Sequence, residues 1–558
     1  MANKLELTWY GKENEPKIEP RLLIENKELS NTNNDPDTEN ILIHGDNLLA
    51  LKALENKYAG KVKCIYIDPP YNTGSAFEHY DDNLEHSQWL GLMKPRLEIL
   101  KNLLSDDGFF CCHIDDSEGH YLKILLDEIF GRKNYLTTFY IRVRYPEKTL
   151  KEDMKFHKEI EQIHIYQSSD SSLPNQKKVN VGFDKFIYRI EELNKPKNII
   201  TLGGKKVEIF EKGSYEIIKE DGSEYGLKEI WASGTILDGN SSGRFFRDYL
   251  SGRYETDGYG ILYKVYGIGD DRYEYRYFTG PQKIGATKGK YYQGVPLDKL
   301  SMKENYKDLP INNFYDFAAN FGNCRQEGSV GFRGGKKPEI LLKTLFEFFS
   351  NPGDLVLDSF LGSGTTAAVA NKMGRRWIGI EMGEHAYTHC KVRLDKVISG
   401  EDKGGITKSV NWQGGGGYRF YELAPTLINQ DAFGEYIINK EYNADMLAAA
   451  VALHEGFSYN PSPEIFWKQS TGSENSYLFV TTKHITAAYL QAIKDTMQDN
   501  EYLIIACKSY DEKAANAFSN IVIKKIPQML LNRCEFNKDN YNLNIVHPPV
   551  YDEVEDDE

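Results

Sequence analysis

One stretch decides the fold of this 558-residue chain: Leu355-Val356-Leu357-Asp358-Ser359-Phe360-Leu361-Gly362-Ser363-Gly364-Thr365-Thr366. A short apolar run ends at Asp358, and a glycine-rich turn leads into a helical segment that starts at Thr365. The next apolar run, 377–381, ends at Glu381. Strand, glycine turn, helix and strand in this order predict a parallel α/β sheet, in which ligands bind where the strands end.

The same alternation extends outward on both sides of a long interruption. Apolar runs at 41–43, 62–67 and 109–114 predict strands, and helical spacing of apolar residues follows at 48–58, 89–104 and 340–349. Between them, Gly-, Tyr- and Lys-rich pieces predict an inserted mixed-β domain. The expected division is an N-terminal arm (1–40), a first sheet part (41–135), the insertion (136–330), a second sheet part (331–400), a Gly-rich connector (401–425) and a C-terminal α/β domain with an acidic tail (426–558).

Composition excludes several classes of protein. No run of 18 apolar residues occurs, and the first residues have no apolar core of the signal-peptide kind, so we expect a cytoplasmic protein without a membrane span. The 7 cysteines form no C-x-x-C pair, so neither a disulfide framework nor a metal site is expected. The net charge is -14, yet residues 131–340 carry +6. A DNA-binding protein needs local positive charge to neutralise phosphates, so this stretch is the candidate DNA contact.

The glycine loop predicts a nucleoside cofactor. Glu381 ends the next strand, 17 residues after Gly364, where an acidic residue commonly binds two ribose hydroxyls. No Lys-Ser or Lys-Thr follows the glycines, and Ala367 stands where a dinucleotide fingerprint has its third glycine. A cofactor with a ribose but no pyrophosphate suits both observations, and S-adenosylmethionine is one. The alternative is a turn that only packs a strand on a helix.

A second motif, Asp68-Pro69-Pro70-Tyr71-Asn72-Thr73-Gly74, follows the predicted strand 62–67. Two prolines make a rigid loop and stop the strand. The Asp68 carboxylate and the Pro69 carbonyl can together accept both hydrogens of a planar amino group. Tyr71 offers a ring on which a base can stack, worth roughly 1–3 kcal/mol. The alternative, a plain Pro-Pro turn, is disfavoured by the glycine loop elsewhere in the chain.

Together, D-P-P-Y and F-x-G-x-G resemble the signature pair of the amino-group DNA methyltransferases. The D-P-P-Y motif precedes the glycine motif by about 290 residues, an order similar to that of the β class of these enzymes. Longer stretches resemble the modification subunit of type III restriction–modification systems: Ile43–Leu48, Tyr66–Gly74, Lys336–Glu339 and Trp412–Gly417. The resemblance covers roughly 41–130 and 330–425.

The resemblance implies a Rossmann-like S-adenosylmethionine-dependent methyltransferase sheet with circularly permuted motifs, interrupted by a target-recognition domain. It implies that Asp68, Pro69, Pro70 and Tyr71 hold a flipped adenine, and Asp rather than Ser at position 68 favours adenine N6 over cytosine N4. The implied cofactor-binding set comprises Asp46 at the adenine ring, Lys337 and Pro338 at the methionine end, Glu381 at the ribose, and Asp358, Phe360, Gly362, Gly364 and Thr365 in the glycine loop.

The resemblance also implies partners. These are duplex DNA, a second copy of the chain, and a helicase–nuclease restriction subunit, because the sequence has no nuclease or helicase motif of its own. Alternatives are a solitary methyltransferase acting on adenine N6 or cytosine N4, an enzyme acting on RNA or on protein amides, and a non-catalytic DNA-recognition subunit.

Overall fold

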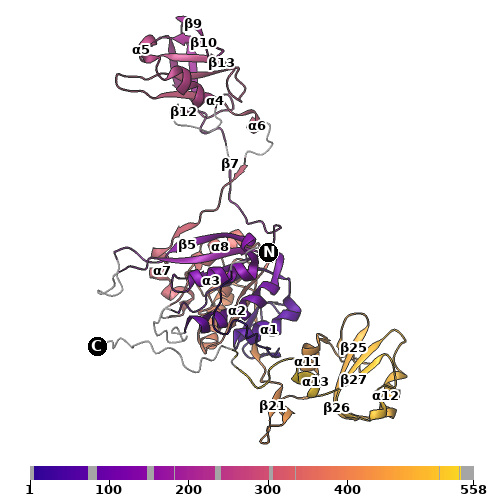
Figure 1. Cartoon of the computed structure of the whole chain (residues 1–558). Coiled ribbons are helices and arrows are strands. Elements are labelled where there is room, and N and C mark those ends of the chain that lie inside the picture. The colour runs from indigo at the N-terminus through magenta and orange to yellow at the C-terminus, as the bar shows by residue number, and fades with distance from the viewer. Residues whose placement is uncertain are drawn as a thin grey trace. The chain divides into compact units, whose positions relative to one another are not determined.

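A computed structural model describes residues 6–72, 85–147, 156–180, 182–232, 241–300, 306–332, 335–514, 516–539 and 541. The chain forms two compact units, one made of residues 1–175 and 312–558 and the other of residues 176–311 (Figure 1). Thr73, Gly74 and the predicted acidic tail lie outside the described residues.

A ten-stranded sheet forms the centre of the first unit. Its strands lie in the order β1 (Leu23–Glu25), β20 (Arg419–Leu423), β2 (Ile41–His44), β19 (Arg376–Glu381), β18 (Leu355–Asp358), β3 (Val62–Ile67), β4 (Leu104–Ile114), β6 (Ile160–Gln167), β5 (Tyr135–Arg142) and β17 (Phe314–Asp316). The six strands from β20 to β4 run parallel, whereas β6 is antiparallel to both β4 and β5. The predicted parallel α/β sheet is therefore confirmed.

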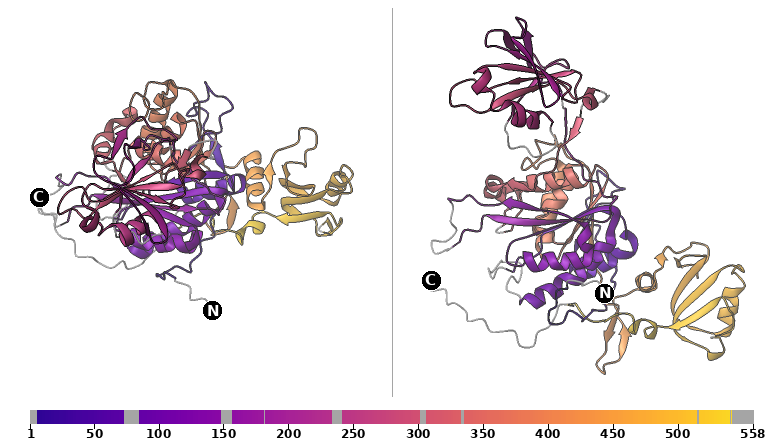
Figure 2. Two further views of the ribbon diagram at one scale, coloured as in Figure 1. Left: turned by 90° about the horizontal axis from the view of Figure 1, so that it is seen from above. Right: turned by 45° about the horizontal axis from the view of Figure 1, so that its top comes forward.

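Helices cover both faces of this sheet. Apolar side chains of α1 (Asn47–Tyr58), α2 (His86–Leu103) and α3 (Gly119–Leu126) pack in one core with alternate residues of β2, β3, β4, β18 and β19. The opposite face carries α8 (Glu339–Phe349), α9 (Thr365–Lys372) and α10 (Val392–Ser399). In the right-hand view of Figure 2 the indigo and purple helices lie below the sheet and the salmon helices above it. α7 (Ala318–Asn323) follows β17.

The insertion differs from its expected bounds of 136–330. β5 and β6 pair with each other, β6 pairs with β4 of the main sheet, and β17 pairs with β5. The compact second unit is therefore confined to 176–311. The sequence pattern missed this because antiparallel strands added at a sheet edge lack the helix-linked spacing of the parallel part.

The expected arm and connector also contribute strands. β20 lies within 401–425 and pairs with β2, and β1 lies within 1–40 and pairs with β20. Gly45 (φ +146°) ends β2 against the Leu423 side chain, where an added Cβ would lie 2.4 Å from a methyl group. These segments thus extend the sheet instead of linking domains.

The second unit is an antiparallel β domain with short helices. Its six-stranded sheet has the order β12 (Lys228–Ala232), β15 (Gly289–Gln293), β14 (Tyr275–Thr279), β13 (Leu262–Tyr266), β10 (Lys205–Phe210) and β9 (Asn198–Leu202). Two strand pairs accompany it, β8 (Tyr188–Glu192) with β11 (Tyr215–Lys219) and β7 (Lys178–Asn180) with β16 (Tyr306–Asp308). The short helices are α4 (Ser241–Phe245), α5 (Tyr254–Asp257) and α6 (Leu297–Leu300).

The C-terminal region has a sheet of its own, in which β25, β26 and β27 run parallel. This agrees with the α/β character predicted for it. Its elements are β21 (Ile428–Gln430), β22 (Tyr436–Ile438), α11 (Ala444–Glu455), β23 (Ser458–Tyr459), β24 (Ser470–Thr471), β25 (Ser476–Ile485), α12 (Ala487–Lys494), β26 (Tyr502–Tyr510), β27 (Ile521–Lys525) and α13 (Gln528–Leu531). Among the described residues, no helix has both the length and the apolar character that crossing a membrane requires.

Candidate active site

The candidate residues meet at one edge of the main sheet. Strands β2, β19, β18 and β3 are parallel neighbours, so their carboxyl ends lie side by side. These ends carry Asp46, Glu381, Asp358 and Asp68 in that order. Open parallel sheets bind ligands at this edge, and the two sequence motifs therefore form one site although they lie far apart in the chain.

The glycine loop has a backbone that only glycine adopts easily. Gly362 (φ +58°) and Gly364 (φ +78°) are both left-handed. A Cβ on Gly362 would point into open space, whereas one on Gly364 would lie 3.2 Å from the Cα atom of Cys390. Gly364 is thus required for helix packing, and Gly362 leaves an open cradle in which a ligand can approach the backbone.

Glu381 is fastened to the glycine loop. Its Oε2 atom accepts a hydrogen bond from the Gly362 N–H (2.7 Å), and its Oε1 atom accepts one from the Gly383 N–H (3.1 Å). His385 Nε2 lies 2.8 Å from the same Oε1 atom. The carboxylate therefore stands beside the cradle at the position expected for a ribose-binding acid.

Asp358 is buried beneath the same loop. Its two oxygens accept hydrogen bonds from the Phe360 N–H (2.9 Å) and from the Thr366 hydroxyl (2.6 Å). Burial nevertheless raises the pKa of Asp358 to about 7. Thr365 is also turned inward, because its hydroxyl accepts a hydrogen bond from Arg393 (2.7 Å). Both side chains shape the loop from below.

A buried charge cluster supports the same loop. Glu339 pairs with Arg393 (2.7 Å) and with Lys372 (2.7 Å), and Lys372 also pairs with Asp402 (2.6 Å). Two cations thus balance two carboxylates in a region closed to water. Arg393 donates onward to Thr365, so the cluster ties α8, α9 and α10 to the glycine loop.

Asp46 caps a helix and pairs with an arginine. Its Oδ1 atom caps α1 by accepting hydrogen bonds from the N–H groups of Leu48 (2.9 Å) and Leu49 (3.1 Å). Its Oδ2 atom pairs with Arg96 (3.1 Å). The adjacent Asn47 donates to the Ser359 carbonyl (2.8 Å), which joins this corner to the glycine loop. A role at the cofactor's adenine ring stays a prediction.

The catalytic-loop candidate is held by side chains from outside its motif. The indole N–H of Trp89 donates to the Pro70 carbonyl (2.8 Å). The Tyr71 hydroxyl donates to Asp68 Oδ1 (2.9 Å) and lies 3.1 Å from Glu161 Oε2. The carbonyl of Pro69 and Asp68 Oδ2, in contrast, accept no hydrogen bond from the described residues.

Lys337 reaches the catalytic loop. Its ammonium lies 3.1 Å from Asp68 Oδ1, 2.8 Å from the Tyr71 hydroxyl and 3.4 Å from Glu161 Oε2. Burial alone would lower the pKa of Lys337, but Asp68 and Glu161 outweigh burial and raise it. Pro338 precedes the first residue of α8. The structure therefore brings Lys337 to the D-P-P-Y motif, and its expected role at the methionine end of a cofactor stays a prediction.

Three further residues of this network were missed from the sequence: Glu161, His113 and Tyr66. Glu161 Oε2 lies 2.9 Å from His113 Nε2, and the Tyr66 hydroxyl lies 2.8 Å from His113 Nδ1. His113 and Tyr66 are buried on β4 and β3. A polar residue at an inward position of each apolar strand was the available signal, because buried polar groups require partners.

Glu118 joins Asn72, which ends one described stretch, to His86, near the start of the next. Its Oε1 atom accepts a hydrogen bond from the Asn72 amide (2.7 Å) and lies 2.6 Å from His86 Nδ1. Burial raises the pKa of Glu118, although Asn72 and His86 oppose that rise. Asn72 has a left-handed backbone (φ +58°), so this contact fixes a strained residue directly after the motif.

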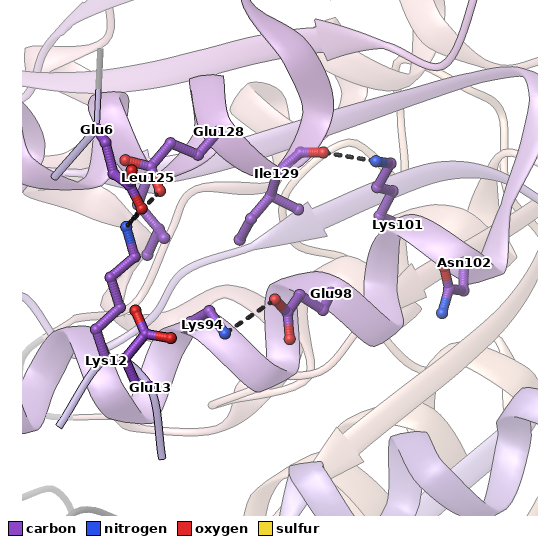
Figure 3. A pocket seen from close by; sticks show the side chains of 10 residues that line it. All are labelled: Glu6, Lys12, Glu13, Lys94, Glu98, Lys101, Asn102, Leu125, Glu128 and Ile129. Carbon is purple, nitrogen blue, oxygen red and sulfur yellow. Dashed lines mark hydrogen bonds and ion pairs between the residues drawn. The ribbon is translucent and has the colours of Figure 1, made fainter. Parts of the chain in front are cut away.

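A pocket elsewhere in the first unit is a separate feature. Figure 3 shows it between the N-terminal segment, the outer side of α2 and the turn after α3. Its lining contains Lys12, Lys94 and Lys101 together with Glu6, Glu98 and Glu128, and Lys12 pairs with Glu128 (2.9 Å). No residue of the sheet edge or of either motif lines it, so this pocket is not the candidate active site.

The geometry agrees with what known proteins show. Residues 62–391, more than half of the chain, match the family model described as DNA methylase. The chain therefore belongs to the DNA methylase family. The matched range contains both motifs, the Lys337 network and the whole second unit.

Three relatives narrow this class. The chain is 36% identical over 420 residues to a probable type III restriction-modification enzyme, the HindVI Mod subunit of Haemophilus influenzae, covering 69% of this chain and 54% of the relative. It is 28% identical to the EcoPI Mod subunit of Escherichia phage P1 (65% and 60%) and 28% identical to the type II methyltransferase M.EcaI of Enterobacter cloacae (75% and 81%). The chain thus spans little more than half the length of the two Mod relatives.

Proposed function

We propose that this chain transfers a methyl group from S-adenosylmethionine to the exocyclic N6 amine of adenine in duplex DNA. The proposal is carried by one observation: two acceptors of the catalytic loop already have donors, whereas two others have none among the described residues. Asp68 Oδ1 and the Pro70 carbonyl are held by Lys337, Tyr71 and Trp89. Asp68 Oδ2 and the Pro69 carbonyl have no donor among the described residues. An exocyclic amine supplies two N–H donors that match this pair.

The chain's own groups then explain the chemistry. The lone pair of an adenine amine is delocalised into the ring, which makes the amine a poor nucleophile. Accepting both N–H bonds at Asp68 and Pro69 localises the lone pair on nitrogen, and preorganised acceptors cost no rearrangement during the reaction. When nitrogen gains the methyl group, its surplus proton moves to Asp68 Oδ2. The base must first leave the duplex stack, at a cost of a few kcal/mol.

The residues around the glycine loop fit the cofactor. Gly362 offers an open cradle, and Glu381 stands next to it with a carboxylate suited to ribose hydroxyls. When bound, S-adenosylmethionine supplies an electrophilic methyl group on a positively charged sulfur. We assign Phe360, Gly362, Gly364 and Glu381 to direct contact and Asp358 and Thr365 to support of the loop. Asp46, Lys337 and Pro338 remain further candidates for cofactor contact.

The relatives suggest the biological setting. Two of them are Mod subunits of type III restriction-modification enzymes. We therefore propose that the chain is the cytoplasmic modification and DNA-recognition subunit of such a system, that it forms a homodimer, and that it works with a helicase–nuclease subunit. The second unit, residues 176–311, would read the DNA sequence. The likeness to the type II methyltransferase M.EcaI covers more of both chains, and it favours a DNA methyltransferase outside the type III systems as the second candidate.

One assay tests the reaction. The purified chain is incubated with radiolabelled S-adenosylmethionine and duplex DNA, RNA or protein, and labelled DNA is digested to nucleosides. We expect label only in DNA and only in N6-methyladenine. Label in N4-methylcytosine, RNA or protein would contradict the proposed substrate. Single-molecule sequencing of DNA from cells expressing the chain then gives the target sequence.

A matched pair of variants tests the site. Asp68→Ala should abolish methyl transfer while calorimetry still detects S-adenosylmethionine binding. Asp107→Ala is the control, because Asp107 pairs with Lys63 of β3 (2.7 Å) but lies near the start of β4, away from the carboxyl ends of the strands. Near-wild-type transfer by Asp68→Ala would contradict the role given to this carboxylate.

A further inference from the structure

Glu161 is the centre of a buried polar network behind the catalytic loop. Its Oε2 atom lies 2.9 Å from His113 Nε2, 3.1 Å from the Tyr71 hydroxyl and 3.4 Å from Lys337 Nζ. It lies on β6, which pairs with β4 and so brings Glu161 to the edge where β3 ends. Neither motif contains Glu161, and the methyl transfer proposed above gives it no task.

The network contains more negative than positive groups. One ammonium, that of Lys337, lies between two carboxylates, those of Asp68 and Glu161. Burial alone would raise the pKa of Glu161, but Lys337, His113 and Tyr71 outweigh it and hold that pKa well below its usual range. Glu161 is therefore ionised, and it shares the positive charge that would otherwise be directed at Asp68 alone.

His113 and Tyr66 form the buried end of this network. Burial raises the pKa of Tyr66 well above its usual value, so its hydroxyl keeps its proton. This hydroxyl shares a hydrogen bond with His113 Nδ1 (2.8 Å). Nε2 of the same ring lies 2.9 Å from Glu161 Oε2. Both partners are buried in the sheet and have little freedom to move.

We propose that Glu161, oriented by His113 and Tyr66, is a positioning residue for the methyl transfer. It holds the ammonium of Lys337 and the hydroxyl of Tyr71 on the Oδ1 side of Asp68. These contacts on Oδ1 leave Oδ2 of Asp68 directed to the target amine. The inference rests on the proposed function, and it adds that the order of contacts runs from Tyr66 through His113 and Glu161 to Lys337 and Asp68.

The first test converts the Glu161 carboxylate into an uncharged amide. Glu161→Gln keeps the size of the side chain but removes its charge. We expect the single-turnover rate of methyl transfer to fall about 10²-fold, the size of effect that small misplacement of reacting groups produces. Calorimetric affinity for S-adenosylmethionine should change less than about twofold, because Glu161 lies on the catalytic side of the site. Glu159→Gln, two residues away and paired with Arg142 (2.8 Å), is the matched control and should behave as wild type.

The pH profile separates positioning from a merely structural role. Lys337 is faced by Asp68 and Tyr71 of the catalytic loop and by Glu161 of β6. Removing Glu161 leaves burial opposed by one carboxylate instead of two, so the pKa of Lys337 must fall. The alkaline limb of the rate profile should therefore move to lower pH in Glu161→Gln. An unshifted limb would overturn the proposal even if the rate fell.

Two further variants keep the proposal open to refutation if Glu161→Gln does not fold. Tyr66→Phe removes a single hydroxyl and should lower the rate less than His113→Gln, because His113 contacts Glu161 directly and Tyr66 contacts it only through His113. Equal rates in Tyr66→Phe, His113→Gln and wild type would contradict the inference alone. Failure of the wild-type chain to methylate DNA would contradict the proposed function instead.

Discussion

The ammonium of Lys337 lies 3.1 Å from Oδ1 of Asp68, although one residue stands before α8 and the other directly after β3. Glu339, two residues after Lys337, pairs with Arg393 and Lys372 beneath the glycine loop. The short segment Lys337–Glu339 therefore joins both parts of the site. Its first residue contacts the catalytic loop, and its last residue pairs with the cations that support the glycine loop. The two motifs are held in one site by this segment.

Replacing Lys337 by methionine should damage both catalysis and stability. Asp68 and Glu161 would lose their shared cation in a poorly solvated place, and breaking such a pair costs about 3 kcal/mol or more. We expect the thermal midpoint of the first unit to fall and methyl transfer to drop at least about 10²-fold. Differential scanning calorimetry and single-turnover kinetics measure the two effects.

The double variant Lys337→Met with Glu161→Gln is the control for the electrostatic cause. It removes one cation and one anion, so it should recover part of the stability lost in Lys337→Met. If the double variant is less stable than the single one, the loss reflects packing of the lysine stem and not the unpaired carboxylates.

Local chemistry explains what the sequence could predict. The glycines at 362 and 364, the prolines at 69 and 70, and the alternation of strands and helices all act on neighbouring backbone, so their patterns are visible in one dimension. The common edge of both motifs followed from the rule that parallel strands end on one side of a sheet.

The missing part of the site depends on strand pairing. Glu161 reaches Asp68 only because β6 pairs antiparallel with β4, and no local pattern specifies that partner. Trp89 looked like an ordinary apolar helix residue, and its indole N–H found the Pro70 carbonyl only in three dimensions. His113 stood between apolar neighbours in a strand, where a histidine has no visible partner in the sequence.

The bond from Trp89 to Pro70 predicts a measurable effect on turnover. Trp89→Phe keeps an aromatic ring in the core but removes the donor to the carbonyl (2.8 Å). Loss of one such hydrogen bond costs about 1 kcal/mol of stability, and the loosened loop should lower the single-turnover rate about tenfold. Trp467→Phe removes an equal bond to Thr496 (2.8 Å) in the C-terminal region and should lower stability without changing the rate. Equal rate losses in both variants would exclude a specific role for Trp89.

Gly362 should be required for cofactor binding and not only for folding. A side chain at this position would fill the open cradle beside Glu381 and would also impose a left-handed backbone, which costs roughly 1–2 kcal/mol. Gly362→Asp should therefore abolish the calorimetric signal of S-adenosylmethionine binding. Gly353→Asp is matched, because Gly353 also has a left-handed backbone (φ +88°) and open space, but lies before β18. Normal cofactor affinity in Gly362→Asp would refute the cradle.

Burial of Asp358 predicts how stability depends on pH. The pKa of this carboxyl is raised from 3.8 to about 7 in the folded chain, so the folded state binds a proton that the unfolded state releases between these values. The contribution of Asp358 to folding stability is therefore most favourable below about pH 4 and is lost as pH rises to 7, by at most about 1.4 kcal/mol for each pH unit.

Asp358→Asn cannot ionise and should not show this loss. We expect the thermal midpoint of Asp358→Asn, relative to wild type, to rise between pH 4 and pH 7 and to level off above pH 7. Asp354→Asn, directly before β18, serves as the control substitution. A constant offset of Asp358→Asn from wild type would show that Asp358 is ionised throughout this range.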